Sequence, residues 1–223
     1  MRIINVEQGS EAWQALRNRP TASNFDRIIT PARGDYAERP ARAYACEIVA
    51  KRLGVYTEPP PSYWMQWGVD NEPNAKHAYT VETGNAITTC GFALPDNTDA
   101  YGGSPDGLIG DDGVLEIKCP KPETIIQWHA EGGLPVAYRP QVQGLLMITG
   151  RQWCDFVGFH PGLALYTYRV VPDIDYQTKL AECLLKLLEE LRRIESLVRR
   201  QDHELVCVST AAMSYSMRGL DDE

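Results

Sequence analysis

Apolar residues recur every three or four positions in several stretches of the chain, which is the spacing of an amphipathic helix. Ser10 stands where a helix N-cap would precede Trp13 and Leu16, and Thr21-Ala22-Ser23 stands where another helix would begin. Pro73 interrupts a longer stretch, and because proline lacks a backbone donor we expect a kink or a restart there. The longer stretches predict helices over residues 38–53, 62–80, 123–131, 139–149 and 173–201.

Apolar segments after Gly84, some of them alternating with polar residues, predict strands. Two of them flank Pro161-Gly162 and two flank the turn signal Gly110-Asp111-Asp112-Gly113, so each pair is expected to form a hairpin. Helices before, between and after these strands favour an α/β (α+β) fold with a central mixed β-sheet flanked by helices. The predicted strands cover residues 86–94, 98–103, 152–159 and 164–171, together with the segments on either side of 110–113.

The length of 223 residues suits a single large domain. The cluster Pro59-Pro60-Pro61 separates an N-terminal helical region, residues 1–60, from a core over residues 61–172. Residues 173–201 follow as a long helix, whose leucines alternate in steps of four and three and favour packing within the chain. The polar residues 208–223 are expected to form a partly disordered tail.

Charge is distributed unevenly along the chain. With 22 Lys and Arg against 30 Asp and Glu, the net charge is −8, so any binding of nucleic acid must rest on local charge. Residues 17–52 hold eight basic and four acidic side chains, a local excess of +4. This excess indicates either a solvated helical surface or a wall that faces phosphate groups.

Composition argues against several classes of protein. The six cysteines are scattered without a C-x-x-C pair, which speaks against a zinc ribbon and a disulfide framework. The four histidines are not spaced as a metal-binding pair. No apolar run approaches the ~18 residues that span a membrane, and the N-terminus lacks the apolar stretch of a secretory signal. We therefore expect a protein of a reducing cytoplasm.

Candidate chemistry centres on Asp106, Glu116 and Lys118. Alternate residues of a strand share a face, so Glu116 and Lys118 point one way while Ile117 points toward the core. A hairpin turn at 110–113 would bring Asp106 beside Glu116. Two carboxylates form a hard-oxygen site suited to Mg²⁺ or Mn²⁺, and Lys118 would orient or deprotonate a water or offset charge. The alternative is a surface hairpin with ordinary ion pairs.

Seven short motifs together are specific, although several of them alone are not. The sequence resembles the lambda exonuclease (YqaJ-type viral recombinase) branch of the PD-(D/E)XK nuclease superfamily, whose motifs follow in the same order over roughly residues 5–160. The motifs are Val6-Glu7-Gln8-Gly9, Trp13-x-x-Leu16-Arg17, Thr21-Ala22-Ser23, Trp67-Gly68-x-x-x-Glu72, Ser104-Pro105-Asp106-Gly107-Leu108, Leu115-Glu116-Ile117-Lys118-Cys119-Pro120 and Gln141-Val142-Gln143. The fold implied is a restriction-endonuclease-like core behind an N-terminal helical region.

The resemblance assigns a role to each matching position. It implies that Asp106, Glu116 and the Ile117 carbonyl bind a metal ion, with Lys118 as the catalytic lysine. It adds Glu72 from the preceding helix, although Pro73 puts the position of that carboxylate in doubt. The resemblance also implies polar members of the catalytic site in the next helix, Gln141 and Gln143.

A second group of residues would contact DNA. The resemblance implies that the 5′-phosphate of the degraded strand is held by Arg17, Ser23, Ser104 and Gln141, since an arginine fork and hydroxyl donors suit a phosphate. Serines also serve as plain caps, so that alternative stays open for Ser23 and Ser104. Arg33 matches a loop arginine that contacts DNA. Met65, next to Trp64, lies where the family places an apolar wedge, and core packing is the alternative for both.

The resemblance implies a Mg²⁺-dependent 5′→3′ double-strand DNA exonuclease, with Mn²⁺ as a possible substitute. It would digest one strand processively to mononucleotides as a ring-shaped homotrimer and leave a 3′ overhang. A single-strand annealing protein would load there, in a phage or prophage system of the bacterial cytoplasm. The alternatives are another PD-(D/E)XK endonuclease, a catalytically silent DNA-binding scaffold on the same fold, and a metal hydrolase with a different substrate.

Overall fold

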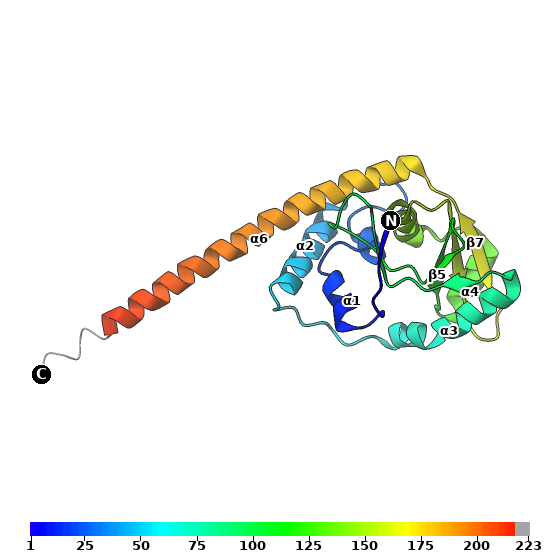
Figure 1. Cartoon of the computed structure of the whole chain (residues 1–223), viewed down its shortest axis with the longest axis horizontal. Coiled ribbons are helices and arrows are strands. Elements are labelled where there is room, and N and C mark those ends of the chain that lie inside the picture. The colour runs from blue at the N-terminus through cyan, green and yellow to red at the C-terminus, as the bar shows by residue number, and fades with distance from the viewer. Residues whose placement is uncertain (217–223) are drawn as a thin grey trace, which may run out of the picture.

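The computed structural model describes residues 1–216, with side chains described as far as Arg199. A five-stranded mixed sheet lies at one end of the body, with helices on both of its faces (Figure 1). A separate two-stranded sheet joins β1 (Arg2–Ile4) to β3 (Phe92–Leu94). The expectation of a central mixed sheet flanked by helices is confirmed.

The strand order of the main sheet places the two predicted hairpins side by side. The strands run in the order β2 (Ile87–Thr88), β4 (Gly107–Ile109), β5 (Gly113–Lys118), β6 (Trp153–Gly158) and β7 (Tyr166–Val170). Neighbours are antiparallel except β5 and β6, which are parallel. A parallel pair needs a crossover, and α4 (Pro122–Glu131), η2 (Val136–Tyr138) and α5 (Arg139–Thr149) provide it.

The N-terminal helices begin where the sequence predicts. Ser10 caps α1 (Glu11–Leu16) and Ser62 caps α3 (Tyr63–Thr83), each by accepting a hydrogen bond from a backbone N–H of the first turn. A 3-10 helix, η1 (Ala22–Arg27), follows Thr21, and α2 spans Glu38–Arg52. The long C-terminal helix is α6 (Ile174–Ser216).

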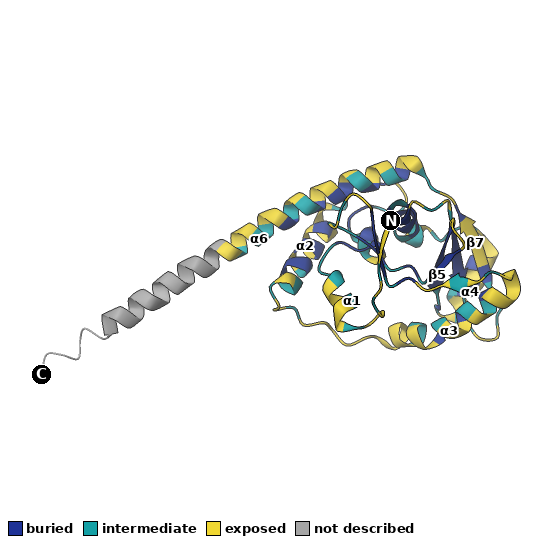
Figure 2. Cartoon of the chain, viewed as in Figure 1, coloured by how far each residue is buried: buried dark blue, intermediate teal, exposed yellow. Residues whose placement is uncertain are grey.

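Each face of the main sheet contributes to its own apolar cluster. Val114 and Phe156 face the larger cluster, which includes residues of η1, α2, α5 and α6. Leu115 and Ile117 face the smaller one, with Ala75 and Tyr79 of α3. Buried positions therefore line both faces of β5 (Figure 2). The larger cluster also takes in Leu180, Leu184, Leu187 and Leu191, which confirms that the leucine stripe of α6 packs within the chain.

Two of the expected strands were wrong, and α3 and α6 continue where an interruption or a tail was expected. Residues 86–94 form two short strands in different sheets, and 98–103 form only isolated bridges at Gly102 and Gly103. Helix α3 runs through Pro73 without a restart, because Ala75 and Tyr79 beyond it are fully buried and hold the second half in place. Helix α6 extends to Ser216, so residues 208–216 of the expected tail are helical, and 217–223 lie outside the described residues.

Cysteine usage fits the expectation of structural thiols. Cys90, Cys119, Cys154 and Cys183 are buried and unpaired, and no disulfide joins cysteines within residues 1–199. Cys207 lies beyond the described side chains. None of the helices that the structure describes combines the length and apolar character needed to cross a bilayer.

Candidate active site

The β4–β5 hairpin brings Asp106 and Glu116 together, as the sequence predicts. Gly110 makes the turn with a positive φ of 49°, which is easily adopted by a residue without a side chain. Asp106 precedes β4, and its backbone N–H donates to the Leu115 carbonyl. Its carboxylate accepts a hydrogen bond from the Ile117 N–H at 2.5 Å, so it lies one residue from Glu116 across the hairpin.

Glu116 is buried with partners on one of its two carboxylate oxygens. The residue is only 2% exposed, in a strand that is buried on both faces. Its Oε1 atom contacts the Lys118 ammonium at 2.7 Å and accepts a hydrogen bond from the Gln141 amide at 2.5 Å. Glu116, Lys118 and Gln141 therefore form one connected group, with Gln141 supplied by α5.

The second carboxylate oxygen of Glu116 is free to bind a cation. Oε2 is buried and has no hydrogen-bond partner among the described residues. An unpartnered carboxylate oxygen inside a protein is costly unless a cation or a donor occupies its free lone pairs. Within residues 1–199, no three His, Cys, Asp or Glu side chains gather as a metal cluster. The donor set available is two carboxylates and a backbone carbonyl, which is the hard-oxygen chemistry that Mg²⁺ prefers.

The charges of the group do not balance one another. Burial raises the pKa of Asp106 well above its ordinary value, and the charge of Glu116 raises it further. Burial also raises the pKa of Glu116, although Lys118 opposes this shift. Burial lowers the pKa of Lys118, but the carboxylates of Glu116 and Asp106 outweigh it and raise that pKa overall. One ammonium group therefore only partly neutralises two acids, the buried Glu116 and the half-buried Asp106.

Glu72 lies close enough to affect this group. Its carboxylate is on α3 and forms an ion pair with the Lys76 ammonium, one helical turn away, at 2.7 Å. Its negative charge contributes to the raised pKa of both Asp106 and Glu116. Because α3 continues through Pro73, Glu72 remains on a regular helix that packs against β5.

We expect Asp106→Asn to stabilise the metal-free protein. The Asp106 carboxyl has a raised pKa, so the native state binds a proton more readily than the unfolded chain. The free energy of unfolding of the metal-free wild type should therefore fall as pH rises from about 4, the pKa of an unfolded carboxyl, through the raised native pKa. Asparagine removes this cost, and unfolding in EDTA at pH 8 should show a gain of about 1 kcal/mol or more, or roughly 2–4 °C in Tm.

Asp112→Asn is the matched control for this prediction. Asp112 is an exposed carboxylate in the same hairpin turn, so its replacement should change Tm in EDTA very little. Equal Tm values for wild type and Asp106→Asn across this pH range would contradict the assignment of Asp106 as an uncompensated acid.

A second polar cluster forms beside Asp106. The Trp13 indole N–H donates to the Ser104 hydroxyl at 2.7 Å, and the Arg17 guanidinium stacks on the Trp13 ring at 4.3 Å. Thr21 bridges to Gly102, so the start of η1 with the exposed Ser23 runs beside the segment that leads to Ser104. The structure therefore brings the expected phosphate-binding segments together. We name Arg17, Trp13 and Ser104 the indole cluster.

Helix α5 approaches η1 closely because Gly144 has no side chain. A Cβ atom at Gly144 would lie 2.4 Å from the Phe25 ring, so any larger residue would push the helix away. The contact fixes the helix that carries Gln141 against the segment that carries Ser23. Local sequence patterns around Gly144 and Phe25 gave no sign of this contact, because the two residues are far apart in the chain.

Gln143 lies apart from the carboxylate group. It is 3% exposed, its amide donates to the Val171 carbonyl, and its oxygen accepts the Asp173 N–H. Gln177 of α6 also donates to it. Side chains that are two residues apart on a helix point in very different directions. Gln143 therefore anchors the start of α6, while Gln141 faces Glu116.

Arg33 and Met65 contact none of the residues grouped around Glu116. Arg33 is exposed in the loop before α2 and lies 3.6 Å from the Asp35 carboxylate. Met65 is 64% exposed in the first turn of α3, next to Trp64, which receives the Lys121 ammonium over its ring. Exposure of Met65 at a helix start disfavours the core-packing alternative.

Of the two alternatives for the basic residues of 17–52, the phosphate-facing wall is disfavoured, because several of these residues pair with acids of the chain. Arg27 and Lys51 both pair with Glu47, and Arg42 pairs with Glu190 of α6. The basic excess of residues 17–52 therefore serves mainly to join α2 to its neighbours.

Two neighbours of the site were not among the predicted site residues. The Tyr138 ring lies 5.5 Å from the Lys118 ammonium, and it also contacts Trp128 and Phe156. Trp13, part of a recognised motif, binds both Ser104 and Arg17. The spacing of Trp13 and Arg17 on one short helix was the signal that could have predicted their contact.

A mixed sheet that presents two carboxylates and a lysine from one hairpin defines a nuclease-type hydrolytic site. A family model described as the YqaJ-like viral recombinase domain matches residues 12–152. The chain therefore belongs to the YqaJ-like viral recombinase domain family, as the motifs predicted. No curated protein sequence matches the chain.

Solved structures support the same assignment. An alkaline exonuclease (LHK-Exo) from Laribacter hongkongensis is 31% identical, with a TM-score of 0.78 over 88% of this chain and 100% of that chain. The same enzyme in complex with dAMP gives the same values. A phage related exonuclease from Haemophilus somnus 129PT, 14% identical with a TM-score of 0.59 over 82% of this chain and 96% of that one, shares the fold. The expectations of an exonuclease-type hydrolase and of a PD-(D/E)XK-like fold are confirmed.

Proposed function

We propose that the protein is a Mg²⁺-dependent 5′→3′ exonuclease of double-stranded DNA. It digests one strand processively to mononucleotides and leaves a 3′ overhang. The observation that carries the proposal is the unpartnered buried Oε2 of Glu116, beside the half-buried Asp106 carboxylate and an ammonium. Its similarity to an alkaline exonuclease that binds dAMP supports a nucleotide product.

Asp106, Glu116 and the Ile117 carbonyl would hold the metal ion, and Mn²⁺ would substitute for Mg²⁺. A divalent ion at this position supplies Lewis acidity toward a phosphodiester and lowers the pKa of water. Lys118, held by Glu116, places a positive charge beside the reacting phosphate. Gln141 fixes the Glu116 rotamer through its hydrogen bond to Oε1. Glu72 would add an acid that could help to hold the metal ion or a water.

The indole cluster would bind the 5′-phosphate, together with Ser23 and Gln141. Arg17 offers a planar fork for phosphate oxygens, and its stacking on Trp13 restricts the guanidinium before DNA arrives. The exposed Met65 would contact the DNA end as a wedge, and Arg33 would contact the duplex from its loop. A terminal phosphate bound next to the carboxylates gives a physical reason for cleavage from the 5′ end.

The assembly proposed is a homotrimeric ring through which the duplex passes, and a ring explains processivity without tight static binding. The acidic total charge would then lie on outer surfaces that repel DNA. A single-strand annealing protein would load on the overhang, in a phage or prophage recombination system of the bacterial cytoplasm.

A time course on linear duplex DNA labelled at one 5′ end tests this function. With Mg²⁺ we expect the label to appear early as a mononucleotide, and with EDTA no release. Closed circular duplex, the matched substrate without ends, should stay intact. Early release of a 3′ label instead, or cutting of the circle, would favour the opposite polarity or an endonuclease.

A further inference from the structure

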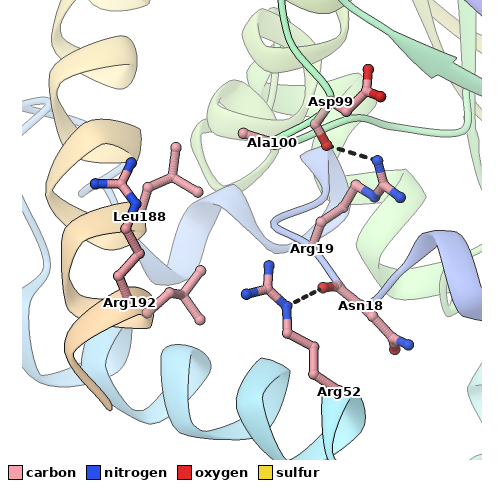
Figure 3. A pocket seen from close by; sticks show the side chains of 8 residues that line it. Asn18, Arg19, Arg52, Asp99, Ala100, Leu188 and Arg192 are labelled. Carbon is pink, nitrogen blue, oxygen red and sulfur yellow. Dashed lines mark hydrogen bonds between the residues drawn. The ribbon is translucent and has the colours of Figure 1, made fainter. Parts of the chain in front are cut away.

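A cavity bordered by the end of α2 and by α6 is lined by three arginines. It measures about 470 Å³, which is within the range of ligand-binding sites, and none of its lining residues belongs to the candidate active site. Arg19 precedes η1, Arg52 ends α2 and Arg192 is on α6, and all three border the same space (Figure 3). We name this cavity the arginine pocket.

Most of the hydrogen bonds that the structure gives these arginines go to neutral carbonyl oxygens. Arg19 donates to the carbonyls of Leu16 and Asp99, and Arg52 donates to the Asn18 carbonyl. Arg52 also pairs with Glu195 at 3.1 Å, but Glu195 is shared with Arg199. Arg192 makes no ion pair with any residue whose side chain the structure describes.

The acid in the lining does not neutralise the pocket. Asp99 is the sole acidic lining residue within the described part of the chain, and its carboxylate pairs with Arg2. It accepts from Arg19 only through its backbone oxygen, and Figure 3 shows the carboxylate turned away from Arg52 and Arg192. Burial lowers the pKa of Arg19, the Arg52 charge lowers it further, and Asp99 opposes both.

Three like charges that converge with only partial neutralisation by acids are stabilised by a bound anion, and the planar fork of arginine matches phosphate oxygens. Leu188 and Ala100 add an apolar wall beside the three guanidinium groups. A phosphate group joined to a less polar body fits both features. We propose that the arginine pocket binds the phosphate of a nucleotide, either free or within a DNA strand. None of the residues proposed to bind the 5′-phosphate, Arg17, Ser23, Ser104 and Gln141, lines this pocket.

Calorimetric titration with 5′-dAMP in EDTA, where no cleavage occurs, tests the pocket on the full chain. Arg192→Gln should raise the Kd about tenfold, because it removes a charged donor. Arg39→Gln, which removes an exposed arginine at the start of α2, should leave the Kd within twofold. Both titrations are repeated in proteins that also carry Arg17→Gln, which removes binding at the candidate 5′-phosphate site. Thermal unfolding verifies that each variant is folded.

A second arm separates the two sources of phosphate. It measures how the affinity for a duplex with 5′-hydroxyl ends depends on salt, again in EDTA. A higher Kd for 5′-dAMP in Arg192→Gln assigns the pocket to free nucleotides. If the Kd for 5′-dAMP is unchanged in Arg192→Gln, but the slope of log affinity for duplex against log salt is smaller by about one, the pocket is assigned to a DNA strand. Unchanged values in both arms would overturn the proposal, whatever the outcome of the exonuclease assay.

Discussion

Replacing Lys118 with alanine should lower the rate of DNA cleavage by about 10³-fold while DNA binding persists. Lys118 is the cation in contact with Glu116, so its loss removes the positive charge beside the reacting phosphate. Glu116→Gln should lower the rate at least as far, because the amide keeps the shape of the side chain but cannot act as an anionic ligand. Single-turnover cleavage of a 5′-phosphorylated duplex measures both effects.

The matched control for Lys118 is Lys186→Ala. Lys186 is an exposed lysine on α6, so the variant loses the same charge at a place remote from the hairpin. Because alanine at 118 leaves Glu116 buried without its ion pair, Tm must be recorded for each variant. A folded Lys118→Ala protein that cleaves at the rate of Lys186→Ala would exclude Lys118 from catalysis.

Arg17→Gln should reduce the preference for a 5′-phosphorylated over a 5′-hydroxyl end by about 10–100-fold. The guanidinium stacks on Trp13, whose indole donates to Ser104, two residues before Asp106, so a phosphate bound there would lie near the proposed metal site. The variant should lose its charged hydrogen bonds to phosphate and keep its fold, since Arg17 has no ion pair among the described residues. Initial rates on the two kinds of end give the preference directly.

Arg39→Gln again provides the control of equal charge. If its phosphate preference matches that of the wild type while that of Arg17→Gln falls, the effect is local to the indole cluster. If wild-type protein digests phosphorylated and hydroxyl ends equally, the assignment of a 5′-phosphate site to Arg17, Ser23 and Ser104 is wrong.

The central hairpin could be predicted from sequence because its determinants are local. A turn signal at 110–113 sets the pairing, and strand alternation then sets which side chains share a face. Glu116 stands between Leu115 and Ile117, so burial of this acid and its need for a partner followed from its neighbours. The resemblance placed Gln141 in the site, but its hydrogen bond to Glu116 was not predicted, since no local pattern connects α5 to β5.

Features that depend on tertiary contacts could not be predicted from local sequence patterns. Alternation predicted one strand over 86–94, but pairing of Phe92–Leu94 with Arg2–Ile4 divides it into two. Pro73 signalled a break, yet burial of Tyr79 outweighs the lost backbone donor. Gln143 shares a motif with Gln141, but helical geometry turns it toward the start of α6.

The arginine pocket likewise could not be predicted from the distribution of charge along the sequence. Counting residues 17–52 gave a basic excess, whereas the structure pairs Arg27 and Lys51 with Glu47. The charge that remains in the pocket comes from three segments, one of them in α6. Such convergence cannot be found by counting along the chain.

The claim on which the account rests is that Asp106 and Glu116 share a divalent cation. Titration of Mn²⁺ followed by electron paramagnetic resonance, which detects the free ion, measures this binding without DNA. The account predicts that wild type and Lys118→Ala remove Mn²⁺ from solution, that Glu116→Gln does not, and that affinity falls as pH is lowered and protons compete. Equal uptake of Mn²⁺ by wild type and Glu116→Gln would contradict it.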